Sequence, residues 1–327
     1  MPHVIRVDET GGPEVLKWVE APLPEPAAGE VRIRQTAVGV NFVDVYYRIG
    51  LYPPPGGSGL PYVPGSEGAG VIDAVGAGVT RFKVGDRVVY QGWVGAYAET
   101  RCFPAERVVR LPDGIDDRTA AAGYLKGLTV HCLLHRTFKV VKGTTMVFHS
   151  AAGGVGTIGC QWAAALGATV IGTVGSDDKI ETAKRAGCAH VINYRKENLV
   201  DRVKAITGGA GVDVVYDSIG KDTFPASLDC LHPLGMWVAF GQSSGLPPSF
   251  QTSLLQQKGS LFATRPTIAH YLASRSDLEA SAASLFEAIA SGTIRIEIGQ
   301  QFPLKDAAAA HRALEGRQTT GATVLIP

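Results

Sequence analysis

The sequence lacks the features of a membrane, secreted or nucleic-acid-binding protein. None of its apolar runs reaches the ~18–20 residues that span a bilayer, and its first residues lack the apolar core of a signal peptide. Its five cysteines are dispersed without a CxxC pair, which is typical of reduced thiols rather than a disulfide framework. The formal net charge is only +1, without a Lys/Arg-rich run. We therefore expect a cytoplasmic protein whose main partner is neither a nucleic acid nor a membrane.

Signatures of metal and nucleophile chemistry are also missing. The chain contains neither HExxH nor GxSxG. His131 and His135 are four residues apart on a predicted helix and could share a face as zinc ligands do, but no nearby Cys or carboxylate has ligand spacing. We predict an ordinary pair of helical histidines and no metal. The missing nucleophile motif excludes less, because catalytic triads assemble in space rather than in sequence.

The character of the sequence changes near Asp116. A chain of 327 residues favours two domains. Upstream of the change, short runs separated by Gly and Pro indicate an irregular, mostly antiparallel β domain, with strands at 31–40, 70–75, 87–90 and 97–102. Downstream, a helix at 118–138 is followed by strands that alternate with helices, at 145–149, 169–174, 190–193, 212–217 and 237–241. This alternation predicts βαβ units and a parallel sheet.

The last part of the chain predicts helices at 277–291 and 305–315 and a strand at 323–326. Its local pattern is compatible with two arrangements. The segment either extends the α/β domain or returns to the first domain.

The strongest chemical signal is the segment AAGGVG at 151–156, between a predicted strand and a predicted helix. It matches the dinucleotide fingerprint, with Ala151 in place of the first glycine. Gly153 would let the backbone approach a pyrophosphate, and Gly156 would allow close packing of helix and strand. The alternative is a tight turn without a ligand. We favour a dinucleotide site, because βαβ units frame the segment and the helix amides would face the anion.

The type of dinucleotide follows from the tip of the next strand. NAD-binding proteins place an acidic residue there, on the ribose hydroxyl. This chain has Gly175 and Ser176 instead, followed by Lys179, which leaves room and a positive charge for a 2′-phosphate. Asp177 and Asp178 count against this interpretation, although acidic residues also favour the first turn of a helix. We predict NADPH.

Motifs along the whole chain carry a family resemblance. They are GGPEVL at 11–16, GVNFVD at 39–44, GLYP at 50–53, PGSEGAG at 64–70, VGDRV at 84–88, KGLT at 126–129, the loop at 151–156, YDSIG at 216–220 and TRP at 264–266. With these motifs the chain resembles the medium-chain dehydrogenase/reductase superfamily, in particular its zinc-free quinone oxidoreductases, the group that includes ζ-crystallin.

The resemblance implies an α/β fold in which a Rossmann domain, a doubly wound parallel sheet, is inserted into a GroES-like, mostly-β domain. Residues 1–124 plus 266–327 are expected to form the GroES-like catalytic domain, and residues 125–265 the Rossmann dinucleotide-binding domain. The active-site cleft is expected at their junction. The resemblance also implies a homodimer joined through the edges of the Rossmann sheets, with the strand at 237–241 or its neighbour as the seam.

The resemblance agrees with the prediction that no metal is bound. Zinc-dependent relatives place a Cys where this chain has Asn41 and a His where it has Ser66. They also carry a cysteine-rich lobe, whereas residues 91–97 contain no cysteine. Asp44 and Glu67 remain beside the position of that zinc site, but two carboxylates without the soft ligands do not make one.

The resemblance also implies the cofactor contacts, and NADPH is the expected cofactor. The residues expected to hold the adenosine end are Ala152, Gly153, Gly154, Val155, Gly156, Gly175, Ser176, Lys179 and Tyr194. Those expected to line the nicotinamide half are Ser218, Phe240, Gly241, Gln242 and Ser243. The residues expected to close over the cofactor are Asn41, Phe42, Val43, Asp44, Thr129, Arg265 and Arg317. Gln242 is a departure, because Asn is the residue expected there. It should alter one polar contact rather than abolish binding.

The resulting hypothesis is an NADPH:quinone oxidoreductase that transfers hydride directly and without a metal. Quinones suit such an enzyme because the hydroquinone product is aromatic and its oxyanion is delocalised. Asn41, Tyr46 and Tyr52 are candidates to line the quinone pocket, although Tyr52 is equally explained by packing at the domain boundary. Asn41 or Tyr46 would donate a hydrogen bond to the developing oxyanion.

Two alternatives remain. An NADPH-dependent reductase of α,β-unsaturated carbonyls would use the same cofactor residues, and the sequence hardly separates it from a quinone reductase. An RNA-binding role, with which ζ-crystallin-like proteins are associated, is a function of another class. The balanced charge and the lack of a basic run interleaved with aromatics argue against RNA as the primary partner.

Overall fold

The computed structural model describes residues 1–53 and 59–327, which form two compact units. The first unit consists of Met1–Leu128, Ala273–Ala290 and Ile296–Pro327. The second consists of Thr129–Leu272 and Ser291–Arg295. The first boundary between them falls within helix α2 (Asp117–His131). The chain therefore leaves the first unit to build the second and then returns to the first.

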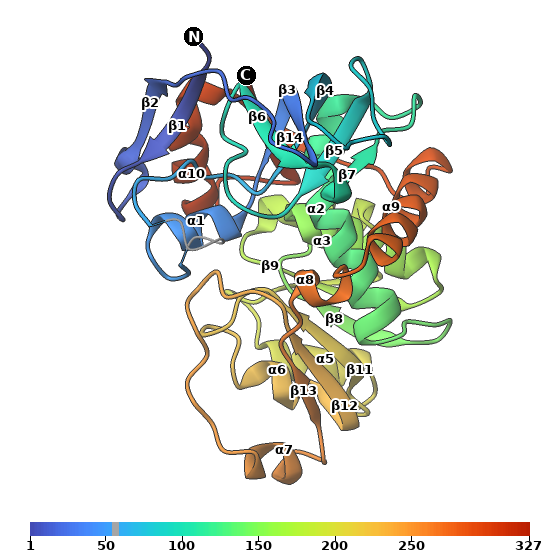
Figure 1. Cartoon of the computed structure of the whole chain (residues 1–327). Helices are drawn as coiled ribbons and strands as arrows, with labels where there is room; N and C mark the ends of the chain where they lie inside the picture. The colour runs from blue at the N-terminus through green and yellow to red at the C-terminus, as the bar shows by residue number, and fades with distance from the viewer. Residues whose placement is uncertain (54–58) are drawn as a thin grey trace. The chain divides into compact units, whose positions relative to one another are not determined.

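The second unit contains a six-stranded parallel sheet with the order β10-β9-β8-β11-β12-β13. Its strands are β8 (Thr145–Phe148), β9 (Thr169–Val174), β10 (His190–Asn193), β11 (Val212–Asp217), β12 (Leu231–Ala239) and β13 (Phe262–Thr264). Counted from β8, this is the 3-2-1-4-5-6 order of doubly wound sheets, and Figure 1 shows β11, β12 and β13 side by side. The order reverses between β8 and β11, where such sheets bind ligands beyond the carboxyl ends of their strands.

Helices alternate with these strands. They are α3 (Gly154–Ala165), α4 (Ile180–Arg185), α5 (Leu199–Ile206), α6 (Ala226–Asp229), α7 (Ser253–Gln257) and α8 (Ile268–Tyr271). Helix α5 begins where the Asn198 side chain accepts a hydrogen bond from the Asp201 amide at 3.1 Å, and it buries Leu199 and Val203, four residues apart, in the core. The helix predicted at 118–138 is α-helical only to His131, and a π-helical segment, Cys132–Thr137, follows it.

The first unit is built on a seven-stranded sheet with the order β14-β15-β3-β4-β5-β7, in which β6 also pairs with β3. Its strands are β3 (Glu30–Val40), β4 (Glu67–Val75), β5 (Arg87–Gln91), β6 (Thr100–Pro104), β7 (Val108–Arg110), β14 (Ile298–Pro303) and β15 (Ala322–Ile326). A separate pair, β1 (His3–Val7) and β2 (Leu16–Glu20), is antiparallel. Only β14 and β15 pair in parallel within the described part of the larger sheet.

The strand predicted at 97–102 is divided between two partners. The Tyr97 carbonyl accepts from the Ile5 amide at 2.8 Å, and Ala98 forms a bridge to Val4 of β1. The pairing with β3 begins only at Thr100, opposite Arg34. A local alternation of apolar and polar residues cannot reveal this change of partner, because both partners are distant in sequence.

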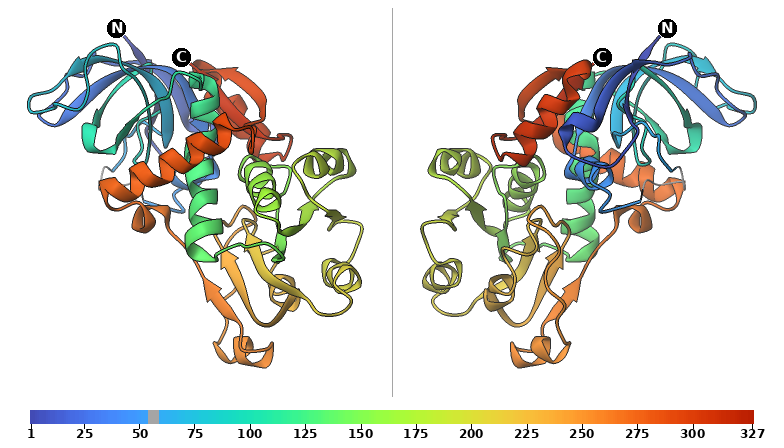
Figure 2. Two further views of the ribbon diagram at one scale, coloured as in Figure 1. Left: turned by 90° about the vertical axis from the view of Figure 1, so that its right-hand side faces the viewer. Right: turned by 90° about the vertical axis from the view of Figure 1, so that its left-hand side faces the viewer.

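The end of the chain returns to the first unit, which decides between the two arrangements left open by the sequence. Strand β15 pairs antiparallel with β3, with Leu325 opposite Val38. Helix α10 (Ala307–Glu315) contributes Ala307 and Ala310 to the core of this unit. Figure 2 shows these C-terminal elements, in red, beside the N-terminal strands, in blue. The predicted architecture, a doubly wound parallel sheet inserted into a mostly-β domain, is confirmed.

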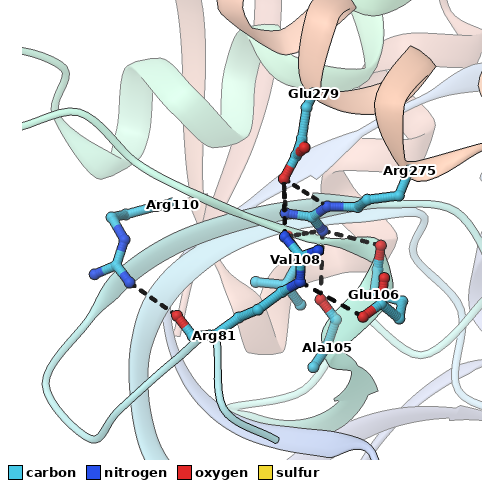
Figure 3. A network of polar contacts seen from close by, with 7 residues as sticks. All are labelled: Arg81, Ala105, Glu106, Val108, Arg110, Arg275 and Glu279. Atoms are coloured by element: carbon cyan, nitrogen blue, oxygen red, sulfur yellow. Dashed lines mark hydrogen bonds and ion pairs between the residues drawn. The ribbon is translucent and has the colours of Figure 1, made fainter.

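Helix α9 (Arg275–Ala290) is attached to the first unit by arginines (Figure 3). Arg275 donates to the carbonyl oxygens of Glu106 at 2.9 Å and Val108 at 2.5 Å and forms an ion pair with Glu279. Arg81 extends the network to Glu279 at 3.4 Å and to Glu106 at 3.7 Å. These contacts fix the segment that follows the second unit onto the short turn before β7.

The strand predicted at 237–241 is the second half of β12, which lies between β11 and β13. A strand with partners on both sides cannot form an edge-to-edge seam, so 237–241 is wrong as a candidate. Its neighbour β13 ends the sheet over the described residues and keeps that role in the predicted homodimer. Within residues 1–53 and 59–327, none of the helices has the length and hydrophobicity needed to cross a bilayer.

Candidate active site

The glycine-rich segment at 151–156 forms the turn between β8 and α3. Ser150 adopts a positive φ of 56°, and its carbonyl accepts from the Gly153 amide at 2.9 Å. Gly153 is the N-cap of α3. At Gly156 a Cβ would lie 2.1 Å from the Ser150 carbonyl oxygen, so only glycine fits there. The turn therefore has the close approach of helix and strand expected from the fingerprint, with the first amides of α3 available for an anion.

A buried polar network joins the carboxyl ends of the strands beside this turn. The His149 imidazole lies 3.0 Å from the Thr173 hydroxyl of β9 on one side and 3.0 Å from the Ser227 hydroxyl on the other. Ser227 donates to the Asp217 carboxylate at 2.9 Å, and the Trp237 indole donates to the same oxygen at 3.1 Å. The network thus connects strands β8, β9, β11 and β12 at their carboxyl ends.

The ionisation of Asp217 and that of His149 are linked within this network. Burial opposes ionisation of Asp217, but its pKa is lowered because His149 and the amides of Ile219 and Gly220 favour the carboxylate. Burial lowers the pKa of His149, and the charge of Asp217 only partly opposes this. Sequence analysis assigned no role to either residue, since only the fold brings 149, 173, 217 and 227 together.

The tip of β9 carries the residues predicted to hold the adenosine end. Gly175 lies against Tyr194, because a Cβ on Gly175 would be 2.9 Å from the Tyr194 hydroxyl. Ser176 precedes the 3₁₀ turn Asp177–Lys179, so these predicted residues lie on one short stretch of the second unit. Asp178 is exposed and Lys179 is partly buried.

The charge of Asp177 is matched by a residue that sequence analysis missed. Lys196 forms an ion pair with the Asp177 carboxylate, and the Asn193 side chain donates to it at 2.6 Å. These hydrogen bonds, from Lys196 and then from Asn193, lower the pKa of Asp177. The negative charge of Asp177, which counted against a 2′-phosphate site, is therefore paired with the positive charge of Lys196. Lys196 is far from Asp177 in sequence, and no local motif marks it.

The predicted nicotinamide residues follow the ends of β11 and β12, and Arg265, predicted to close over the cofactor, follows the end of β13. The Phe240 amide donates to the Asp217 carbonyl at 2.8 Å, and the Ser243 amide donates to the Ser218 carbonyl at 3.1 Å. Arg265 donates to the Gln242 side-chain oxygen at 2.5 Å, so the residue that departs from the family pattern has a specific polar contact. Gly241 lies between Phe240 and Gln242 in the same turn. Parallel strands end at one edge of the sheet, which brings these residues together.

The remaining predicted residues lie in the first unit, except Thr129, which is in the second. Asn41 precedes helix α1 (Phe42–Arg48), which carries Val43 and Asp44. The backbone amide of Asn41 donates to the Asp44 carboxylate at 2.9 Å. The rings of Tyr46 and Tyr52 meet edge to face, with centroids 5.3 Å apart. The proposed quinone residues therefore come from α1 and the loop after it. Arg317 follows α10 and has a positive φ of 57°.

Asp44 is a fully buried carboxylate held by hydroxyl groups. Ser66 donates to it at 2.6 Å and Tyr97 at 3.2 Å, and the Tyr97 oxygen lies 2.9 Å from the His311 imidazole. Burial raises the pKa of Asp44 to about 6, and the charge of Glu67 adds to the increase. His311 also contacts Arg48, and burial followed by the Arg48 charge lowers the pKa of His311 to about 3.

Glu67 is another fully buried carboxylate of the first unit. Its Oε1 accepts from the Asn41 side chain at 2.8 Å and from Lys126 at 2.7 Å, and its Oε2 accepts from the Leu125 amide at 2.7 Å. Sequence analysis noted Lys126 only as part of a family motif. The one available signal was a charged residue in the apolar stretch of the predicted helix.

The two histidines considered as zinc ligands pack as rings. The centroids of His131 and His135 are 4.9 Å apart, and Trp162 lies against both. Burial, and then the neighbouring His135, lowers the pKa of His131 to about 4. Over residues 1–53 and 59–327, no group of three or more His, Cys, Asp and Glu side chains has the arrangement of a metal site.

Comparisons with known proteins extend over the whole chain. The zinc-binding dehydrogenase family model matches residues 154–287, and the alcohol dehydrogenase GroES-like domain model matches residues 27–113. The quinone oxidoreductase of Salmonella typhimurium is 50% identical over 326 residues, which cover 99% of each chain. The 2-haloacrylate reductase of a Burkholderia species is 46% identical over 325 residues, 98% of each chain. The crystal structure of Escherichia coli quinone oxidoreductase complexed with NADPH has a TM-score of 0.97 and 48% identity, covering 99% of this chain and 100% of that one.

Replacing Asp44 by Asn should change how stability depends on pH. The pKa of Asp44 in the folded protein, about 6, lies above the ordinary value of 3.8, so its ionisation disfavours the folded state. Its contribution is therefore greatest below about pH 4 and is lost as the pH rises through about 6. Relative to D44N, we expect the free energy of unfolding of the unaltered protein to fall by about 3 kcal/mol across this range.

Urea unfolding at a series of pH values measures this difference. Asp113→Asn, which removes an exposed carboxyl in a loop of the same unit, is the control. A D44N curve parallel to the unaltered one would mean that Asp44 does not titrate in this range.

Proposed function

We propose that this chain, which belongs to the quinone oxidoreductase family of the medium-chain dehydrogenase/reductase superfamily, reduces quinones with NADPH by direct hydride transfer. As a member of that family it is an oxidoreductase. The observation that carries the proposal is the turn between β8 and α3. It combines a glycine that no other residue can replace with free helix amides at the point where a doubly wound sheet binds nucleotides.

The residues around β9 suit NADPH better than NADH. An NAD site needs a carboxylate for the ribose hydroxyls, and Gly175 and Ser176 stand at that tip instead. Asp177 is paired with Lys196, so it adds little net repulsion to a 2′-phosphate. Lys179 lies on the same turn. The E. coli relative, complexed with NADPH, is consistent with this choice.

The remaining cofactor assignments are part of the same proposal. Residues after β11 and β12 bind the nicotinamide half, and Arg265, which is hydrogen-bonded to Gln242, closes over the cofactor. The residues at the start of α1, together with Thr129 and Arg317, complete the binding of the cofactor. When bound, NADPH supplies a hydride from C4 of its nicotinamide, and the quinone takes up this hydride and one proton to become a hydroquinone.

The chain itself must orient the quinone and stabilise charge on its oxygen. The Asn41 amide has two N–H groups, and donation to Glu67 uses one of them. The other can donate to the developing oxyanion, an interaction commonly worth a few kcal/mol. Tyr46 and Tyr52 offer aromatic surfaces against which a flat quinone ring can pack. A proton from solvent or from a polar side chain completes the reaction. A quinone needs no Lewis acid because its reduced form is aromatic.

A second candidate is reduction of α,β-unsaturated carbonyls. The observation that favours it is the 2-haloacrylate reductase, which is 46% identical over almost the whole chain. Such a reaction would use the same cofactor residues and the same oxyanion donor. The two functions therefore differ only in the substrate that fits.

Purified protein should oxidise NADPH faster than NADH when given a series of benzoquinones and naphthoquinones, with a chelator present throughout. An alkenal is assayed in parallel, and absorbance of the reduced cofactor measures each rate. Turnover of the alkenal alone would keep the cofactor assignment and move the function to the second candidate. Loss of quinone turnover in the chelator would contradict the metal-free reaction.

Replacing Lys196 by Met should weaken NADPH binding and leave NADH binding nearly unchanged. Asp177 would lose the positive charge of Lys196, and its carboxylate would repel the 2′-phosphate. We therefore expect the KM for NADPH to rise about fivefold. Lys184→Met is the matched control, because it removes an exposed lysine paired with Glu181 in the same unit. If K196M and K184M change the ratio of NADPH to NADH efficiency equally, Lys196 has no specific role.

A further inference from the structure

The carboxylate of Glu67 is fixed in position by its surroundings. It is fully buried at the start of β4, and its partners Asn41, Lys126 and Leu125 all belong to the first unit. Lys126, on α2, is only 5% exposed. The backbone of β3 leaves room for the carboxylate because residue 39 is glycine, where a Cβ would lie 2.3 Å from the Glu67 Oε1. Glu67 therefore has little freedom to turn away from these donors.

The orientation of the Asn41 side chain depends on the charge of Glu67. A side-chain amide has donors on its nitrogen and an acceptor on its oxygen, and an ionised carboxylate offers only acceptors. Asn41 must therefore turn its nitrogen toward Glu67, as observed at 2.8 Å. A protonated carboxyl could donate as well as accept, and it would allow the amide to reverse. The ionised state of Glu67 thus determines which atoms of Asn41 remain for a substrate.

The charge of Glu67 in turn depends on Lys126. A carboxylate in a buried site is costly unless a cation and hydrogen bonds compensate it. Asp44, Tyr90 and Tyr97 are titratable groups that also interact electrostatically with Glu67. These groups are neutral or negative, so they do not favour a carboxylate. Lys126, 2.7 Å from Oε1, supplies the compensating positive charge.

We propose that Lys126 is a positioning residue for the hydride-transfer reaction. It holds Glu67 as a carboxylate, which fixes the Asn41 amide with its nitrogen toward Glu67 and leaves the second N–H as the donor to the substrate oxygen. This assignment rests on the proposed function for its catalytic consequence. The orientation of Asn41 itself can be tested in the resting protein.

Nuclear magnetic resonance of the Asn41 side chain gives the first test. The chain has three asparagines, Asn41, Asn193 and Asn198, so ¹⁵N-asparagine labelling yields three side-chain signals, and Asn41→Asp identifies one. In the unaltered protein this signal should be constant from about pH 7 to about pH 9, above the pKa of about 6 of Asp44. In Lys126→Met it should move with pH, because unpaired buried glutamates can take up protons at up to about pH 8–9.

The double variant Lys126→Met/Glu67→Gln is the matched control. It lacks the lysine, as K126M does, and it also lacks the carboxyl group that could titrate at position 67. Its Asn41 signal should again be independent of pH. Glu67→Gln alone serves if K126M does not fold, and its Asn41 signal should differ from that of the unaltered protein at every pH. An Asn41 signal in K126M, or in E67Q, that matches the unaltered protein throughout overturns the proposal.

Quinone reduction gives the second test. We expect kcat of K126M to fall roughly tenfold or more, with a new ionisation in its pH profile that the double variant lacks. The KM for NADPH should change little, because the phosphate turn lies in the other unit. If the unaltered protein reduces no quinone, the proposed function fails while the resonance experiment still decides the role of Lys126. If it does reduce quinones and K126M keeps the unaltered pH profile, only the assignment of Lys126 fails.

Discussion

The hydrogen bonds to the buried carboxylate of Asp217 are the interaction on which the arrangement at the carboxyl ends of the strands in the second unit depends. It accepts hydrogen bonds from the amides of Ile219 and Gly220, from two hydroxyls and from the Trp237 indole. These donors come from the segment that follows β11, from α6 and from β12, so one charge connects three parts of the second unit. A buried charge requires this degree of satisfaction, and the turns that carry the candidate cofactor residues are ordered as a consequence.

The first unit stabilises two fully buried carboxylates, Asp44 and Glu67, in different ways. The negative charge of Glu67 is compensated by a lysine. Asp44 instead accepts hydrogen bonds from a hydroxyl and a backbone amide, and the charge of Glu67 raises its pKa. The two carboxylates lie on either side of Asn41, one contacting its side chain and the other its backbone. Residues that stand beside a metal in zinc-dependent relatives thus belong here to a hydrogen-bonded network around an amide.

The sequence predicted the fold class and the phosphate turn because both depend on local patterns. Alternating strands and helices and the segment at 151–156 can be recognised without knowing any distant contact. Lys196, Lys126 and His311 could not be found in this way, because each acts on a residue far along the chain. The same limit explains the strand predicted at 97–102, whose two halves pair with different strands, and the misplaced edge at 237–241. The assigned roles of the site residues stay predictions, resting on motif and resemblance.

The return of the chain to β3 has a consequence for biosynthesis. Strand β15 completes a sheet whose central strand, β3, is made near the start of translation, while the second unit is almost entirely one continuous stretch. At about 5–20 residues per second, roughly 3–11 s separate synthesis of the end of that stretch from synthesis of β15. During this interval the inserted unit can fold on the ribosome. The backbone groups of β3 that later pair with β15 stay without that partner until β15 has been made. The nascent first unit, rather than the second unit, is therefore the part of this protein that exposes an unpaired strand for longest and that we expect chaperones to bind.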